Sequence, residues 1–170
     1  HMKNLILFLT FFSTLFLACN SDSNSKNTIN DIPDEKLWAI FLGDFKNAIG
    51  KNDLQDIVKL IDFPLDGNFF KTNTGKGLSK NGVLKNYGKI IGTTVRERVI
   101  IAKTDEWSER KINSRDDSKK FGVPVGETMK VLTLNFVFNK GEEDQTESAQ
   151  IFYFAKVKGD YKWCAMEIVG

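Results

Sequence analysis

The chain has 170 residues, of which 41% are hydrophobic and 27% are charged, a balance typical of a folded domain and not of a disordered chain. Its formal net charge of +2 gives no reason to expect nucleic acid as a partner. The only histidine, His1, precedes Met2, so we interpret it as a residue left by cloning. Without it, the sequence excludes a Ser/His/Asp triad, a Cys/His dyad and a metal site built on histidine.

Residues 1–18 are interpreted as that extra residue followed by a signal peptide. Lys3 gives a positive start, and an apolar stretch runs from Leu5 to Ala18. This stretch is shorter than the roughly 20 residues that a membrane-spanning helix needs, and it has the length of a signal-peptide core. An ordinary secretory leader is the alternative to a lipoprotein leader.

The end of this stretch, Leu15 to Cys19 (LFLAC), resembles the lipobox of bacterial lipoproteins. The resemblance implies that a diacylglycerol is attached to the sulfur of Cys19 and that a signal peptidase cuts just before it. The protein would then contact a membrane through this lipid. In enteric lipoproteins an aspartate after the cysteine signals retention in the inner membrane. Because Asn20 stands there instead, we expect a place in the bacterial cell envelope, at the outer membrane.

Residues 19–32 form the next segment, which contains the lipidated cysteine and a polar stretch from Asn20 to Asp31 (NSDSNSKNTIND). A stretch with so few apolar residues cannot bury much surface, which predicts a flexible tether. The globular domain is then expected over residues 33–170.

The first half of this domain has helical periodicity. The spacing of its apolar residues predicts helices over residues 33–50, 52–63 and 79–89. Asn52 is expected to cap the second of them. Residues 94–103 are ambiguous, because their β-branched side chains suit either a short helix or a strand.

In the second half the apolar residues alternate, which is the period of a strand. Strands are expected over residues 128–139, 148–158 and 161–169, with a tight turn at Gly159-Asp160, and together they form an antiparallel meander. Residues 112–120 are expected to be a polar loop. Helices followed by long strands give an α+β class, with N-terminal helices packed on a curved antiparallel sheet.

This order of elements resembles the nuclear transport factor 2-like superfamily, the cone-shaped fold that includes ketosteroid isomerase. Residues 41–65 (FLGDFKNAIGKNDLQDIVKLIDFPL) and 159–169 (GDYKWCAMEIV) carry the resemblance. A cystatin-like arrangement with a single helix is the alternative fold. The resemblance implies a cone that can hold an apolar pocket, and the alternative is that the same side chains fill the core. The side chains expected to line the pocket are Trp38, Phe45, Tyr87, Phe136, Phe154 and Trp163.

The sequence favours neither a cofactor nor a metal, and it assigns no catalytic residue. Gly75-Lys76-Gly77 lacks the Ser or Thr that a phosphate-binding loop needs after its lysine. The acids of Asp116-Asp117 and Glu142–Asp144 lack the spacing of a calcium loop, so solvated loops are expected there. If the chain were an enzyme, the resemblance to ketosteroid isomerase would point to a carboxylate in the cone. The candidates are Asp44, Asp62 and Glu167.

Two further features concern the domain. Cys164 is expected to be a small, buried, unpaired apolar group. Residues 71–111 contain ten basic and four acidic residues, an excess that suits anionic headgroups or an acidic partner if the charges cluster in space. The alternative is a solvated surface on which they do not cluster.

Three functions are compatible with these patterns. The first is a lipid-anchored envelope protein whose domain binds a small apolar ligand or a protein and is not an enzyme. The second is an enzyme that uses a carboxylate in an apolar cone, and the third is a structural or inhibitory surface module. The sequence does not indicate an oligomeric state.

Overall fold

A computed structural model describes residues 32–67, 77–138, 141 and 146–170. The chain divides into two compact units, residues 1–31 and 32–170, and the second holds all the described residues. The predicted signal peptide, Cys19 and the tether up to Asp31 therefore lie outside the described residues. So do Gly75-Lys76 and the acids Glu142–Asp144.

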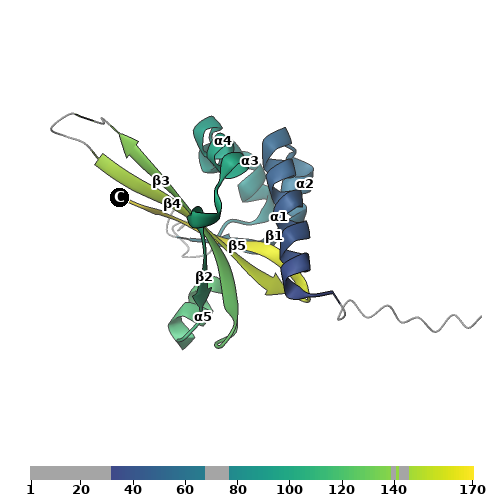
Figure 1. The fold of residues 1–170 in the computed structure, drawn as a ribbon. Coiled ribbons are helices and arrows are strands. Elements are labelled where there is room, and N and C mark those ends of the chain that lie inside the picture. Colours follow the sequence, from purple (N-terminus) through teal and green to yellow (C-terminus); the bar gives the residue numbers. More distant parts are fainter. Residues whose placement is uncertain (1–31, 68–76, 139–140, 142–145) are drawn as a thin grey trace, which may run out of the picture. The chain divides into compact units, whose positions relative to one another are not determined.

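The predicted α+β class, with N-terminal helices packed on a curved sheet, is confirmed (Figure 1). The strands of this sheet pair antiparallel except for the first and the last in the chain, residues 61–66 and 160–169, which pair parallel. The helices are α1 (Asp34–Lys51), α2 (Leu54–Lys59), α3 (Lys80–Ile90), α4 (Thr93–Ile101), the short 3-10 helix η3 (Thr104–Glu106) and α5 (Arg115–Phe121). The strands are β1 (Ile61–Asp66), β2 (Trp107–Lys111), β3 (Thr128–Phe138), β4 (Thr146–Val157) and β5 (Asp160–Val169). This set does not match a cystatin-like arrangement with one helix. Within the described ranges, no helix has the length and apolar character to cross a membrane.

Side-chain caps fix where α2 and α3 begin. The hydroxyl of Ser79 accepts a hydrogen bond from the N–H of Gly82 in the first turn of α3. The cap of α2 is Asp53, whose carboxylate accepts hydrogen bonds from the N–H groups of Gln55 and Asp56. The prediction that Asn52 caps this helix is therefore wrong. Asn52 instead follows the last turn of α1 with a φ of 57°, and asparagine tolerates this left-handed region.

The five strands form one sheet in the order β1-β5-β4-β3-β2. The predicted meander of β3, β4 and β5 is confirmed, since each pairs antiparallel with the next. Its tight turn is shifted by one residue from the prediction. Lys158 and Gly159 occupy the turn, with φ values of 54° and 97°, and Asp160 begins β5. Positive φ at both central residues matches the twist of the flanking strands.

The prediction of a polar loop over residues 112–120 is wrong, because α5 begins within it. The hydroxyl of Ser114 accepts a hydrogen bond from the N–H of Asp117, and the helix ends at Gly122, which has a φ of 67°. Only Phe121 is buried in this seven-residue helix, so no apolar period marks it in the sequence. The ambiguous residues before it are resolved as α4 over most of their length.

The sheet carries a hydrophobic core on each of its faces. The larger core packs α1 to α4 against one face, where Leu132 and Phe152 are fully buried. The smaller core lies on the other face and joins Phe121 of α5 to Val131 and Tyr153 of the sheet. Figure 1 shows α1 to α4 grouped together and α5 separate from them beside β2. The sheet is thus covered on both faces, although not along its whole length.

Candidate functional site

An open apolar groove lies where β3 ends and β4 begins. Its volume is about 400 Å³, which is within the range of small-molecule sites. The lining comes from the first turn of α4 and from three strands. It consists of Thr94, Val95, Phe136, Phe138, Ser148, Ala149, Gln150 and Ile168. None of these described lining residues is charged, and five of the eight are apolar.

The groove forms because the strands continue beyond the helices that cover them. Leu132 and Leu134 of β3 are fully buried under the helices. Two residues further along the same face of the strand, Phe136 is only partly buried, and after another two Phe138 is 53% exposed. At the matching end of β5, Ile168 is 38% exposed. Apolar surface is therefore left open to solvent at this end of the sheet.

Gln150 fixes the inner end of the groove. This side chain is buried, and its Nε2 donates a hydrogen bond of 3.0 Å to the carbonyl of Ile90 at the end of α3. The same nitrogen lies 2.7 Å from the sulfur of Met166 on β5. The amide thereby ties α3 to the sheet at the point where the helical cover stops. Gln150 is not among the six predicted lining residues, although a polar residue in a row of apolar strand positions is a usable signal in the sequence.

The six predicted lining residues divide between the groove and the core. Phe136 lines the groove. Phe45, Phe154 and Trp163 are fully buried, Tyr87 is buried, and Trp38 packs against the same core. The ring of Phe154 lies 5.0 Å from that of Phe45 and 5.7 Å from that of Trp38. These five side chains therefore lie in the hydrophobic core, which is the alternative to lining a pocket.

The hydroxyl of Tyr87 is buried and has no hydrogen-bond partner among the described residues. Burial raises the pKa of this hydroxyl to about 12. Tyr87→Phe is therefore expected to leave the free energy of unfolding unchanged or to raise it by about 1 kcal/mol, since the variant removes an unsatisfied polar group. Urea unfolding followed by tryptophan fluorescence measures the difference.

Tyr153→Phe is the matched control, because its hydroxyl donates a hydrogen bond of 2.7 Å to Glu167. This variant is expected to lose about 1–2 kcal/mol. A loss as large in Tyr87→Phe would contradict the unsatisfied state of the Tyr87 hydroxyl.

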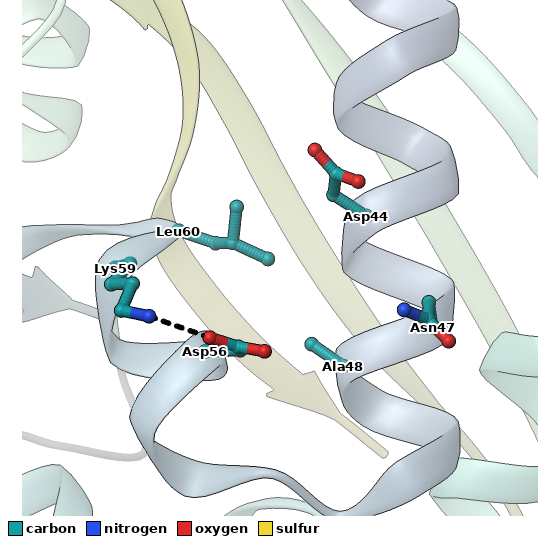
Figure 2. Close-up of a pocket in the computed structure, with 6 residues that line it drawn as sticks. All are labelled: Asp44, Asn47, Ala48, Asp56, Lys59 and Leu60. Atoms are coloured by element: carbon teal, nitrogen blue, oxygen red, sulfur yellow. Dashed lines mark hydrogen bonds and ion pairs between the residues drawn. The ribbon is translucent and has the colours of Figure 1, made fainter. Parts of the chain in front are cut away.

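A second, polar crevice separates α1 from α2, and it contains the candidate carboxylate Asp44. Figure 2 shows Asp44 on α1 across the crevice from the ion pair of Asp56 and Lys59, whose atoms lie 2.7 Å apart. The volume of the crevice is about 270 Å³. Asp44 is exposed, and the ion pair is largely exposed as well. Asp44 thus lies in an exposed, polar crevice and not in an apolar pocket.

Glu167 joins α5 to the sheet. Its carboxylate accepts the hydrogen bond from Tyr153 and forms an ion pair of 2.6 Å with Lys120 of α5. Burial alone would raise the pKa of Glu167, but Lys120 and Tyr153 outweigh it and hold this pKa below its usual value. The third candidate, Asp62, lies on β1. The structure therefore does not bring the three carboxylates together, and none of them lines the groove.

Glu167→Gln is expected to lower the free energy of unfolding by about 1–3 kcal/mol at neutral pH, because it leaves Lys120 without its partner. The pKa of Glu167 is lower in the folded than in the unfolded chain. The stabilisation by this carboxylate is therefore complete above the unfolded pKa, and it is lost as the pH falls through the folded pKa.

Urea unfolding at neutral pH and in acid measures this loss, with Glu127→Gln as a control at an exposed carboxylate. The difference in the free energy of unfolding between the native protein and Glu167→Gln should disappear in acid. If this difference in the free energy of unfolding were the same at every pH, the role of the ionised carboxylate would be contradicted.

Cys164 is buried and unpaired. Its thiol donates a hydrogen bond of 3.2 Å to the carbonyl of Tyr153. Burial is the main cause that raises the pKa of this thiol to about 12. A thiol that is protonated and covered in this way is a poor nucleophile.

The basic segment over residues 71–111 is partly neutralised in the fold. Arg98 pairs with Glu106, and Arg110 pairs with Asp117 of α5 at 3.0 Å. Lys71 and Lys76 lie outside the described residues. The other basic residues of α3 and α4 occupy exposed and half-buried positions. Among them, Arg96 of α4 directly follows Val95, which lines the groove.

Comparison with known proteins finds no matching family model and no matching curated protein. Among solved structures, the chain is similar to an NTF-2 like protein of unknown function from Shewanella oneidensis MR-1. The two sequences are 12% identical, and the match covers 79% of this chain and 97% of the other with a TM-score of 0.37. A likeness at this level carries no argument about the groove.

Proposed function

We propose that this chain is a lipid-anchored protein of the bacterial cell envelope whose domain binds an apolar ligand or a protein segment without catalysing a reaction. The open apolar groove is the observation that carries the proposal. Exposed, contiguous apolar surface on a folded domain marks a place where another molecule binds. The anchor is supported by the resemblance of Leu15–Cys19 to a lipobox.

The chemistry of the groove favours binding over catalysis. Its described lining offers two hydroxyls and one amide as polar groups and contains no carboxylate, lysine, arginine or cysteine. General acid–base catalysis needs a titratable group within hydrogen-bond reach of the substrate. The buried candidate Glu167 is held by Lys120 on the opposite side of the sheet from the large core. An enzyme using one of the three carboxylates is therefore the less favoured function.

The groove also lies far from the point where the N-terminal segment enters the domain. Asp34, at the start of α1, contacts the far end of β4 through an ion pair of 2.5 Å with Lys156, and it accepts a hydrogen bond of 2.9 Å from Tyr161. The groove lies at the other end of β4, at Ser148–Gln150. At about 3.3 Å per strand residue, the two places are roughly 20 Å apart. The groove and the start of α1 thus lie at opposite ends of β4.

Filling the groove tests its role. Ala149→Phe places a ring in the lining, and Ala39→Phe places the same ring on the exposed side of α1 as the matched control. The probe is dodecanol with a photoreactive diazirine on its chain, added to the full chain in phosphatidylcholine nanodiscs. After illumination, mass spectrometry of tryptic peptides locates the label.

The peptide of residues 131–140, which contains two of the lining residues, is expected to be labelled in the native protein and in Ala39→Phe. Ala149→Phe is expected to reduce this labelling about tenfold, because the inserted ring occupies the space of the chain. Equal labelling of this peptide in all three proteins would contradict the groove as the binding site.

A further inference from the structure

We propose that α5 is a lid on the face of the sheet that carries the smaller core, and that it opens as a unit while the rest of the domain stays folded. The ion pair of Lys120 with Glu167 is the latch that keeps this lid closed. The lid lies on the opposite face from the groove, which adjoins the larger core. Three features support the lid: the way its segment leaves the sheet, the few side chains that attach it, and the apolar surface that it covers.

The lid segment, residues 113–125, leaves the sheet and returns to it at one place. The N–H of Ile112 donates a hydrogen bond of 2.9 Å to the carbonyl of Glu127, and the N–H of Gly126 donates one of 2.8 Å to the carbonyl of Ile112. These bonds continue the pairing of β2 with β3. The lid segment can therefore move without breaking a hydrogen bond between the two strands. Gly122 and Gly126, with φ values of 67° and 97°, supply flexible positions on its return path.

Two apolar side chains attach the lid segment to the sheet. Phe121 is the one buried residue of α5, and its ring lies 4.6 Å from that of Tyr153 on β4. Val123, which follows the helix, is buried as well. The other residues of the lid segment are exposed or half-buried. Opening therefore uncovers far less apolar surface than global unfolding, which exposes both cores.

Two ion pairs close the lid at its rim. Lys120 pairs with Glu167 of β5 at 2.6 Å, and Asp117 pairs with Arg110 of β2 at 3.0 Å. Both cations also lie over the ring of Phe121, at 5.0 Å and 5.1 Å from its centre. The side chain of Glu167 is 12% exposed, whereas that of Asp117 is 30% exposed. Because opposite charges attract more strongly where water is excluded, the pair of Lys120 with Glu167 is the principal latch.

The surface beneath the lid is apolar. Phe121 covers Tyr153, and the thiol of Cys164 on the next strand donates a hydrogen bond of 3.2 Å to the carbonyl of Tyr153. Both residues are buried in the smaller core together with Val131 of β3. Lifting the lid segment removes Phe121 and Val123 from this core. The latch thus controls whether the apolar side chains of three neighbouring strands are covered or open.

The rate at which N-ethylmaleimide labels buried cysteines tests the lid on the full chain. Val123→Cys places a thiol under the lid, and Val83→Cys places one in the larger core as the matched control. Both rates are measured without urea and in 1 M urea, and mass spectrometry of tryptic peptides follows each cysteine separately. The rate for Val123→Cys is expected to change less than about twofold, because opening of the lid exposes little surface. The rate for Val83→Cys is expected to rise about fivefold or more, since labelling there requires the whole domain to unfold.

A second pair of variants tests the latch. Lys120→Gln is expected to raise the labelling rate of Val123→Cys about fivefold, because it removes the ion pair with Glu167. Lys119→Gln is the matched control, since it removes the neighbouring exposed charge and should leave the rate unchanged. The native Cys164, followed in the tryptic peptide of residues 163–170, is expected to respond to both variants in the same way.

Each other outcome overturns a stated part. If labelling of Val123→Cys rose with urea as steeply as that of Val83→Cys, or were absent below the unfolding transition, the lid would be overturned. Equal rates in Lys120→Gln and Lys119→Gln would overturn the latch. If Val123→Cys responded to Lys120→Gln and Cys164 did not, the surface assigned beneath the lid would be overturned.

Discussion

Phe154→Ala is expected to lower the free energy of unfolding by about 3–5 kcal/mol, the usual cost of deleting a fully buried aromatic side chain. The ring is fully buried at the centre of the larger core. It meets Phe45 of α1 at 5.0 Å and Trp107 of β2 at 5.8 Å. Its loss leaves a cavity between the helices and the sheet that neighbouring rigid rings cannot fill. Urea unfolding of the full chain, followed by fluorescence and circular dichroism, measures the change.

Phe138→Ala is the matched control, because it deletes the same side chain from the exposed end of β3. Phe138 is 53% exposed, so this change is expected to cost no more than about 1 kcal/mol. If both variants lost the same stability, the boundary between the packed core and the open groove would be misplaced.

Cys19→Ala is expected to move the protein from the membrane fraction to the soluble fraction, or to leave it with its signal peptide uncut. Each buried methylene of a lipid anchor contributes about 0.8 kcal/mol, so two or three acyl chains hold a protein firmly at a membrane. The variant removes the sulfur that would carry them. Fractionation of the cells, followed by detection of the protein in each fraction, measures the shift.

Cys164→Ala is the matched control for the anchor. Cys164 is buried in the smaller core, so this variant should stay in the membrane fraction. If Cys19→Ala were still cleaved and still partitioned normally into membranes, the lipoprotein hypothesis would be defeated.

Much of the fold could be predicted from local patterns. The apolar spacing of α1, the Ser79 cap of α3 and the alternation along the meander are all signals that a few neighbouring residues carry. The short elements, β2 and α5, were harder to predict from the sequence. The sequence of β2, WSERK, contains mostly polar residues. This strand joins the sheet by pairing with β3, which is distant in sequence. α5 buries only Phe121, and the ring of Phe121 packs on Tyr153 of the sheet, which is distant in sequence.

The groove could not be predicted for a related reason. Aromatic content identified side chains that would lie under the helices, and Trp163 and Phe154 do lie there. Whether such side chains enclose a pocket or fill a core depends on how far the helices extend over the sheet, which is a property of the assembled fold. The groove begins where that cover stops, beyond Leu134. Of the six residues expected to line a pocket, Phe136 is the one that stands at this border.

Mass spectrometry of the N-terminal tryptic peptide is the most direct test of the proposed lipid anchor on Cys19. The measurement uses protein isolated from the membrane fraction of a bacterium that makes the full chain. The peptide is expected to span residues 19–26, CNSDSNSK, and to carry a diacylglyceryl group on the sulfur of Cys19. A membrane-fraction peptide that extends upstream of Cys19, or that contains its unmodified thiol, would contradict the lipid anchor.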